Sequence, residues 1–341
     1  MLLPFINATV NLFIIMIVLI IIAFINTPVF LLRTLIKHNG TFFTANASYS
    51  EDVTPRIIGA VYPPGFLTSN AHLCPGKGTN ISLLIAVFST PSLWMSRNII
   101  RKTWGQYTRR HDVSVVFFIG FTTNEVTTKY LEVEQECYAD IVQGRFSDSY
   151  HNLTYKTLSI LEWVEGFCPK ADFLLKTDDD VFVHVENTLK LISALDRNAR
   201  RIYGSIVKKL EPYRDMKIKY FISKKQYKLG RFPDFTGGPG YLIPVRLVPE
   251  LYSAALNFPF LKVEDVLFTG IIARFLGIKL VHMSNFHSSR ISLSNYDIRK
   301  AINVHSVSRS EQLLMWRMIH SREVNRLEFE QTIFFSIKDM N

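Results

Sequence analysis

Hydrophobic positions along this chain form two kinds of pattern. Three short, almost wholly apolar runs, which begin at Ile81, Val113 and Ala171, predict buried strands. Longer segments that separate these runs are predicted to be helical. The helical segments cover residues 92–104, 124–138 and 152–166. Strands that alternate with helices in this way predict an α/β sandwich with a mostly parallel central sheet.

One much longer apolar segment stands at the N-terminus. Residues 1–32 contain no charged side chain. About 20 apolar residues can cross a bilayer as a helix, which predicts a short cytoplasmic tail at 1–9 and a transmembrane signal-anchor at 10–32. A cleaved signal peptide is the alternative, but it would need a basic segment before the apolar run. One feature disagrees with the predicted orientation, because Arg33 and Lys37 follow the span instead of preceding it.

The composition of the chain changes after the apolar segment. Residues 33–79 are rich in Thr, Ser, Asn, Pro and Gly, which predicts a lumenal stem before a folded domain at 80–341. Four N-x-S/T glycosylation acceptors support the lumenal side. They begin at Asn39, Asn46, Asn80 and Asn152. The three cysteines permit at most one intramolecular disulfide, and their spacing suggests no zinc site.

Size and charge narrow the class of protein. The chain has 341 residues, of which 48% are apolar, and this is ample for one large or two medium domains. The formal net charge is +10, yet no nucleic-acid-binding motif accompanies it, so no nucleic-acid partner is expected. A loose group of lysines indicates a solvated face or a surface for an anionic acceptor or phosphate. These are Lys208, Lys209, Lys217, Lys219, Lys224, Lys225 and Lys228.

The strongest candidate for chemistry is the run FLLKTDDDVFVHV, residues 173–185. Runs of like charge usually lie in solvated turns, but Asp178, Asp179 and Asp180 lie between two apolar runs without Gly, Pro or Asn. Carboxylates held against apolar strands would raise one another's pKa unless a hard divalent cation neutralised them. The pattern therefore predicts a metal site at the carboxyl end of a strand, where ligands bind in α/β sheets.

Two further motifs follow this cluster. The segment FPDFTGGPGYLIP, from Phe232, predicts a glycine loop that can approach a ligand, with a plain turn as the alternative. Glu264 and Asp265 stand at the start of an apolar helix, where acidic residues are ordinary caps. Beside a metal site, however, this pair could supply a general base. The sequence lacks the motifs of common dehydrogenases, P-loop proteins and serine hydrolases.

Six motifs follow one another along the chain. They are RNIIRKTWG from Arg97, ADIVQGRFSDSYHNLTYKTL from Ala139, CPKADFLLKTDDDVFV from Cys168, FTGGPGYLIP from Phe235, EDVLFTGI from Glu264 and VHSVSRSEQLLMW from Val304. Their order and spacing resemble the β-1,3-galactosyltransferase family, glycosyltransferase family 31. That family also contains β-1,3-N-acetylglucosaminyl- and N-acetylgalactosaminyltransferases and, more distantly, the Fringe enzymes. The resemblance covers roughly residues 80–320.

This resemblance implies a type II Golgi membrane protein whose catalytic α/β domain has the GT-A fold. Such a protein binds a UDP-sugar and Mn²⁺ through a D-x-D motif. The implied reaction is inverting transfer of a hexose, galactose or else an N-acetylhexosamine, in β-1,3 linkage to a glycan on a glycoprotein or glycolipid. A catalytically silent relative that binds a glycan or assists a partner enzyme is the alternative. None of the acidic residues assigned to chemistry is missing, which favours the enzyme.

The resemblance also assigns roles by matching position. Asp180 would coordinate the metal directly, while Asp178 and Asp179 would hold the ribose or the metal's waters, with Asp178 also a candidate ligand. His305 is the candidate for a further metal ligand, and a structural or surface histidine is the alternative. Asp265 matches the general base that takes the proton of the acceptor hydroxyl on the face opposite UDP.

Four other positions complete the predicted site. Glu264 would orient the acceptor or support Asp265. Arg97, Arg101 and Lys176 would contact the nucleotide or its phosphates.

The chain also departs from the family's pattern. Many members have cysteine where Thr236 and Ile272 stand here; loss of one disulfide would produce this joint absence, and that loss need not affect catalysis. Cys137 is then a candidate partner for Cys168. Pro239 and Pro244 would stiffen the glycine loop and could alter acceptor choice.

Overall fold

We obtained a computed structural model of the chain, which describes residues 55–292 and 295–320. The predicted tail and transmembrane anchor, with the sequons at Asn39 and Asn46, lie outside these residues. No helix within the described ranges is long and apolar enough to cross a membrane.

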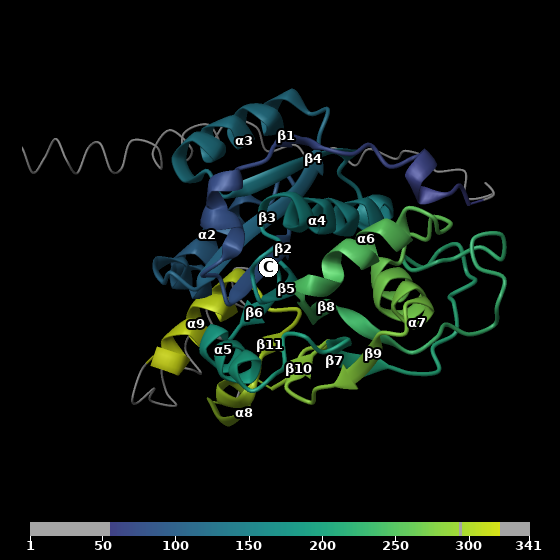
Figure 1. Cartoon of the computed structure of the whole chain (residues 1–341). Coiled ribbons are helices and arrows are strands. Elements are labelled where there is room, and N and C mark those ends of the chain that lie inside the picture. Colours follow the sequence, from purple (N-terminus) through teal and green to yellow (C-terminus); the bar gives the residue numbers. More distant parts are fainter. Residues whose placement is uncertain (1–54, 293–294, 321–341) are drawn as a thin grey trace, which may run out of the picture.

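An eight-stranded sheet forms the centre of the domain, in the order β1-β4-β3-β2-β5-β8-β7-β9 (Figure 1). Its strands are β1 (Phe66–Thr68), β2 (Leu83–Phe88), β3 (Val113–Phe121), β4 (Ile141–Ser147), β5 (Phe173–Asp178), β7 (Arg201–Val207), β8 (Phe235–Pro244) and β9 (Lys279–His282). Strands β4, β3, β2 and β5 run parallel, as do β7 and β9, whereas β8 is antiparallel to both β5 and β7. The sheet is mixed but mostly parallel, which confirms the predicted α/β class.

Helices and a small second sheet complete the described domain. The helices are α2 (Trp94–Lys102), α3 (Glu125–Tyr138), α4 (Leu153–Phe167), α5 (Val185–Ser193), α6 (Val248–Ala255), α7 (Ala273–Phe275), α8 (Asn295–Lys300) and α9 (Arg309–His320), with a π-helix, η7 (Val266–Ile272), directly before α7. The second sheet joins β10 (Phe286–His287), β11 (Asn303–Val304) and β6 (Phe182–Val183).

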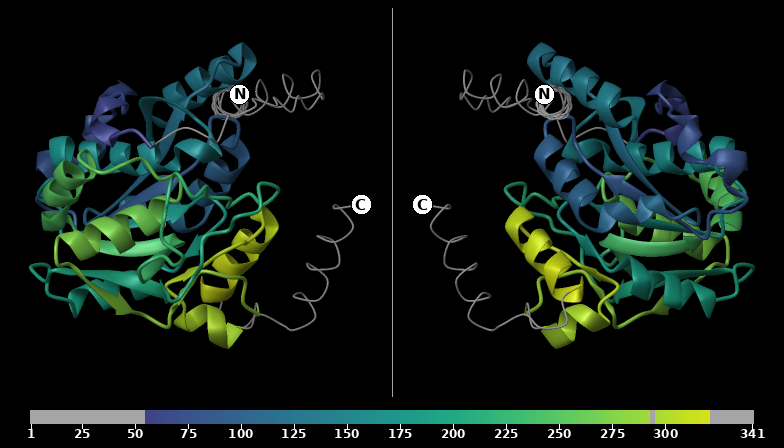
Figure 2. Two further views of the ribbon diagram at one scale, coloured as in Figure 1. Left: turned by 90° about the vertical axis from the view of Figure 1, so that its right-hand side faces the viewer. Right: turned by 90° about the vertical axis from the view of Figure 1, so that its left-hand side faces the viewer.

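Helices cover both faces of the main sheet, so the described residues form two hydrophobic cores (Figures 1 and 2). Along β2, Leu84 and Ala86 face the core that contains α4 and α6. Leu83 and Ile85 face the opposite core, which contains α2 and α9. Because side chains alternate along a strand and both faces are covered, β2 is an uninterrupted apolar run. All three strands and all three helices predicted above are found, within two residues at each end.

The predicted glycine loop is wrong, because FTGGPGYLIP forms β8, an interior strand of the main sheet. Its glycines make room for neighbouring side chains: a Cβ on Gly240 would lie 2.5 Å from Asn303 Nδ2, and one on Gly237 would lie 2.5 Å from Ser288 Oγ. The register with β7 shifts opposite this segment. Pro239 is tolerated where the ladder is interrupted in this way.

The predicted domain boundary at residue 80 comes too late in the sequence. Residues 55–79 pack onto the domain, where β1 pairs with β4 and Ile58 is fully buried. Their polar, turn-rich composition suggested a stem because β1 is very short and the neighbouring elements are single turns of 3-10 helix. At least this part of the predicted stem therefore belongs to the folded domain.

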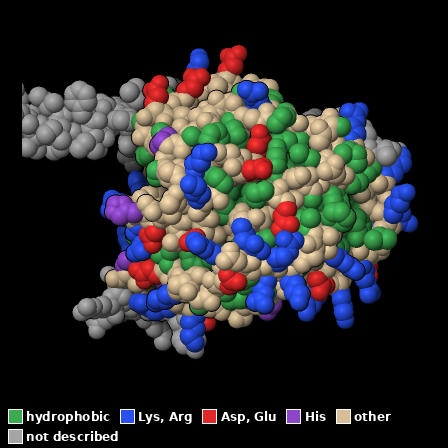
Figure 3. Space-filling model, viewed as in Figure 1, with side chains coloured by type: hydrophobic (Ala, Val, Ile, Leu, Met, Phe, Trp, Pro, Cys, Tyr) green, Lys and Arg blue, Asp and Glu red, His purple; other side chains and the backbone are tan. Residues whose placement is uncertain are grey.

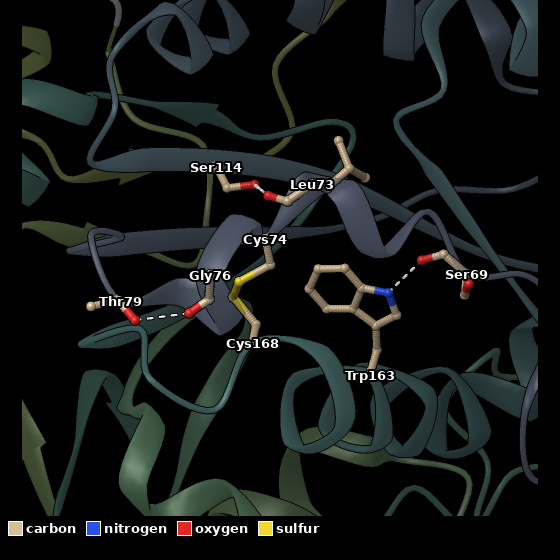
Figure 4. The surroundings of a disulfide bond; sticks show 8 residues. All are labelled: Ser69, Leu73, Cys74, Gly76, Thr79, Ser114, Trp163 and Cys168. Atoms are coloured by element: carbon tan, nitrogen blue, oxygen red, sulfur yellow. Dashed lines mark hydrogen bonds between the residues drawn. A yellow bond between two sulfur atoms is a disulfide. The ribbon is translucent and has the colours of Figure 1, made fainter.

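A disulfide between Cys74 and Cys168 attaches this N-terminal segment to the end of α4 (Figure 4). The predicted pairing of Cys137 with Cys168 is wrong, because Cys137 lies exposed on α3 as a free thiol. Trp163 packs beside the disulfide and donates its indole N–H to the carbonyl of Ser69 at 2.6 Å. Both the covalent link and this hydrogen bond connect α4 to the segment before β2.

Replacing Cys74 and Cys168 together with serine is expected to lower the free energy of unfolding by about 2–5 kcal/mol. The bond joins residues separated by 94 positions, so its loss frees a long loop in the unfolded chain. Chemical denaturation under non-reducing conditions measures the change, and Cys137→Ser is the matched control with unchanged stability. Equal midpoints for the double variant and the wild type would contradict this expectation.

Candidate active site

The predicted acidic residues converge on one cavity of about 520 Å³. It opens at the carboxyl ends of β2 and β5, which is where ligands bind in α/β sheets. Residues from many parts of the chain line it. Among them are Ser89 after β2, Lys176 and the three aspartates at the end of β5, Gly238 of β8, Glu264 and Asp265 before η7, and His305 after β11.

Asp178, Asp180 and His305 form a group that could hold a divalent cation. One ligand atom from each lies within 4.8 Å of the others. The imidazole Nδ1 of His305 donates to the carbonyl of Ser288 at 3.0 Å, which leaves Nε2 facing Asp180 at 3.4 Å. Two carboxylates and an imidazole nitrogen are a donor set that fits Mn²⁺. The structure thus brings together all three predicted metal ligands.

Asp180 and His305 each stabilise the charged form of the other. Burial would raise the pKa of Asp180, but hydrogen bonding and charge from His305 outweigh it and hold that pKa below its usual value. Burial would likewise lower the pKa of His305, but Asp180 raises it. A cation bound here would replace the proton that this pair otherwise shares.

Lys176 links the candidate metal group to the second acidic pair. Its ammonium group is almost fully buried and lies 2.7 Å from Asp178 Oδ1 and 3.2 Å from Glu264 Oε1. It also donates to the carbonyl of Gly238 at 2.7 Å. Burial would lower the pKa of Lys176, but the two carboxylates raise it, so the side chain stays charged. The predicted contact with a phosphate therefore competes with three contacts inside the protein.

Glu264 is held in place by its neighbours. Its carboxylate is buried, and Oε2 accepts hydrogen bonds from Tyr241 Oη at 2.9 Å and Thr157 Oγ1 at 2.8 Å. Oε1 faces Lys176. Because other side chains contact both of its oxygens, Glu264 is suited to orienting its surroundings.

Asp265 has the properties expected of a general base. Its Oδ1 accepts from the backbone N–H of Val266 at 2.9 Å, and its Oδ2 accepts from the N–H of Gly238 at 3.1 Å. Burial and the charge of Glu264 raise the pKa of Asp265 to about 7. A carboxylate with this pKa can take up and release a proton near neutral pH.

Arg97 and Arg101 do not line the cavity. Arg97 is fully buried, pairs with Glu134 at 2.6 Å and donates to Ser89 Oγ at 2.9 Å. That hydroxyl donates in turn to Asp179 at 2.7 Å, and burial raises the pKa of Asp179 to about 6. Arg101 pairs with Glu134 at 2.7 Å. Arg97 therefore supports Asp179 through Ser89, whereas Arg101 supports Glu134, and neither faces the cavity in which the nucleotide contact is predicted.

Sequence reasoning missed several residues of the cavity. Lys156 is buried on α4, where its ammonium pairs with Asp148 at 2.9 Å and donates to the carbonyl of Ser89. Its signal was a lone charge in an apolar stretch of helix. Tyr150 and Tyr220 line the outer part of the cavity with their rings 6.1 Å apart, and nothing in their local sequence distinguishes them from core aromatic residues.

The sequence is similar to those of known glycosyltransferases. Beta-1,3-galactosyltransferase 1 of Mus musculus is 31% identical over 262 residues, which cover 76% of this chain and 79% of the relative. N-acetyllactosaminide beta-1,3-N-acetylglucosaminyltransferase 4 of Homo sapiens is 33% identical over 252 residues, which cover 72% of this chain and 66% of the relative. A crystal structure of the galactosyltransferase LgtC with donor and acceptor sugar analogs aligns with 73% of this chain and 99% of its own, at 12% identity and a TM-score of 0.37.

These sequence relationships place the protein in the class of glycosyltransferases. A sequence model described as Galactosyltransferase matches residues 95–284, which is 190 of the 341 residues. The chain belongs to this galactosyltransferase family.

Proposed function

We propose that this protein transfers a hexose, galactose in the first place, from a UDP-sugar to a hydroxyl group of a glycan, in β-1,3 linkage and with inversion. The observation that carries the proposal is one cavity that joins a group able to hold a cation with a carboxylate whose pKa lies near neutrality. The sequence relatives support the linkage type by their names. The GT-A designation stays a prediction from the family resemblance.

The residues of the cavity would have different roles in such a reaction. A single displacement with inversion needs a base on the side opposite the leaving UDP, and Asp265 would take the acceptor proton onto its carboxylate. The N–H groups of Val266 and Gly238 hold this carboxylate in place. The charge of Glu264 raises the pKa of Asp265, and the positive charge of Lys176 offsets the repulsion between the two carboxylates.

Asp178, Asp180 and His305 are the residues that would hold Mn²⁺. When bound, the ion would supply positive charge that stabilises the diphosphate as UDP departs. Asp178 is the last residue of β5, Asp180 lies in the turn after it, and His305 follows β11, so their relative position depends on the contacts between these two segments.

Location in the Golgi membrane, as a single-pass type II protein with a lumenal catalytic domain, belongs to the same proposal. Disulfides persist in oxidising compartments, so the bond between Cys74 and Cys168 supports a lumenal domain. The acceptor would be a glycan on a glycoprotein or glycolipid.

Gln312 of α9 holds the backbone of the aspartate turn. Its side chain is buried, and Nε2 donates to the carbonyl of Asp179 at 3.2 Å while Oε1 accepts from Trp104 Nε1 at 3.2 Å. Beside it, the N–H of Val307 donates to the carbonyl of Asp180 at 2.9 Å. These hydrogen bonds fix the turn that carries two of the candidate metal ligands against the segment that carries His305.

Replacing Gln312 with leucine is expected to weaken Mn²⁺ binding by about tenfold, because the second layer around a metal site commonly contributes 10–100-fold to affinity. Calorimetric titration of the purified protein with Mn²⁺ measures this change. Trp104→Phe is the control, since it removes one donor to Gln312 but leaves the hydrogen bond to Asp179. A leucine variant that melts earlier yet binds Mn²⁺ like the wild type would limit Gln312 to a structural role.

The proposed function is tested with the full chain purified in mild detergent. UDP release is measured with each common UDP-sugar and a panel of glycan acceptors, with Mn²⁺ or with EDTA. We expect metal-dependent turnover with one donor, and analysis of the product linkage identifies the hydroxyl. No turnover across the panel, together with no Mn²⁺-dependent binding of UDP, would reject the enzyme in favour of a silent glycan-binding relative.

A further inference from the structure

A second cavity lies beside the first and has a different character. Its volume is about 780 Å³, and it lies between the end of β7, the start of β9, the π-helix η7 and α7. Phe232 lines both cavities, so the two share a wall. The backbone N–H of Phe232 donates to the carbonyl of Leu210 at 3.0 Å, and its ring packs against Tyr227 with centroids 4.9 Å apart. The shared wall is therefore held in place from two sides.

Basic side chains dominate the lining of this second cavity. Asp234 is the single acidic residue in the lining, against five basic residues. The basic residues are Lys208, Lys209, Arg231, Arg274 and Lys279. Arg231 pairs with Glu211 at 3.3 Å, but the other four form no ion pair with a carboxylate of the described residues. Figure 3 shows Lys and Arg side chains gathered over the part of the molecule where Figure 1 places β9 and α7.

The electrostatic potential in the second cavity is expected to be positive. Five positive charges against one negative charge in the lining leave a formal excess of four, and Glu211 reduces its effect only beside Arg231. Positive charges that surround a cavity attract anions, most strongly at low salt. A merely solvated basic face would spread its charges apart, whereas these surround one concave surface that adjoins the active cavity.

The second cavity adjoins the end of the active cavity where the acceptor would bind. Thr269 and Gly270 of η7 line it, and Thr269 Oγ1 donates to the carbonyl of Asp265 at 2.6 Å. By contrast, none of the candidate metal ligands contributes to its lining. A group bound there is therefore on the side of the candidate base and separate from the residues that would hold the donor diphosphate.

We propose that the second cavity binds a sulfate ester or carboxylate of the acceptor glycan, so that the protein prefers acidic acceptors. This inference rests on the proposed function and names the acceptor class within it. The hydroxyl that reacts would lie near Asp265, and the acidic group, on a neighbouring sugar, would lie beyond Phe232 among Lys208, Lys209 and Arg274.

The test compares two oligosaccharides that differ only in one sulfate group. Competition experiments with the full chain give the ratio of kcat/KM for the sulfated over the neutral acceptor. We expect a ratio of about 10 at low salt, the order expected from a few partly exposed charge contacts, and a smaller ratio as ionic strength rises. A second pair of acceptors that differ in one carboxylate distinguishes the two acidic groups.

The triple variant Lys208→Gln, Lys209→Gln, Arg274→Gln is expected to bring the ratio close to 1 while turnover of the neutral acceptor stays within about twofold. The control variant Lys102→Gln, Lys129→Gln, Lys190→Gln removes the same charge from exposed positions away from the cavity and should keep the wild-type ratio. Equal use of both acceptors by the wild type, or an equal loss for both acceptors in the triple variant, would overturn the proposal.

Direct binding separates this inference from the proposed function. Binding of the sulfated oligosaccharide, and of inorganic phosphate as a simple anion, is measured by calorimetry without donor. We expect the oligosaccharide to bind more tightly than phosphate and to lose this advantage in the triple variant. If turnover is absent but this binding is found, the proposed reaction fails and the site stands. If neutral acceptors turn over but the sulfated one gains no affinity, the site fails and the reaction stands.

Discussion

Replacing Asp265 with asparagine is expected to lower kcat by about 10²–10⁴-fold, the usual contribution of a positioned general base. Asparagine keeps the size of the side chain and an oxygen for one of the two backbone N–H groups, but it cannot take up the acceptor proton. Initial rates of UDP release measure the loss. Unchanged Mn²⁺-dependent binding of UDP in the variant would show that the donor part of the site is intact.

Glu264→Gln is the matched variant, and it should behave differently. A glutamine can still accept from Lys176 and donate to Tyr241, so a large part of the activity should remain. The charge of Glu264 raises the pKa of Asp265, so removing that charge lowers this pKa. The acid side of the pH profile should therefore move to lower pH in this variant.

The pH dependence of kcat/KM in the wild-type protein is determined by Asp265 and the charged groups around it. Asp265 must be deprotonated to act as a base, and its pKa is about 7, so kcat/KM should fall as the pH drops through this value. Burial and the charge of Glu264 raise the pKa of Asp265, and Lys176 lowers it. If Glu264→Gln were as inactive as Asp265→Asn and left the profile of its residual activity unshifted, the base would be Glu264 instead.

The parts of the fold that sequence predicts well are those with one dominant local signal. β2, β3 and β5 are apolar on both faces, which few other structures require, and their bounds are predicted within two residues. β8 was missed because its glycines and Pro239 are disfavoured in strands by local preference. Here the tertiary structure decides, since Asn303 and Ser288 occupy the space that side chains on β8 would need.

The same division holds for the site. Carboxylates at strand ends and before a helix are conspicuous in an apolar context, so Asp178, Asp180 and Asp265 could be predicted. An arginine that binds a phosphate and one buried against a carboxylate have the same sequence signal, so the sequence could not show that Arg97 is buried and pairs with Glu134. Gln312 has no charge and lies 133 residues from Asp179, so only the folded chain shows that they meet.

Removing the metal site is expected to have the second large effect. Replacing Asp180 with alanine deletes one of the three side chains that would hold Mn²⁺ and leaves His305 without its acidic partner. Mn²⁺ affinity should fall by about 100-fold or more, since even an outer contact commonly contributes 10–100-fold. Turnover at low Mn²⁺ should fall in proportion, and EDTA should abolish turnover of the wild type.

Asp179 provides the control, because it carries the same charge in the same turn but lies outside the group of candidate ligands. Its carboxylate accepts from Ser89 Oγ at 2.7 Å and faces Arg97 through that hydroxyl. Asp179→Asn should therefore bind Mn²⁺ within a few-fold of the wild type, measured by calorimetric titration without donor. Equal weakening in both variants would mean that the ion responds to the summed negative charge of the turn, and the assignment of Asp178, Asp180 and His305 as its ligands would be wrong. A loss of about 100-fold or more in Asp180→Ala, beside a change of only a few-fold in Asp179→Asn, would assign direct coordination to Asp180.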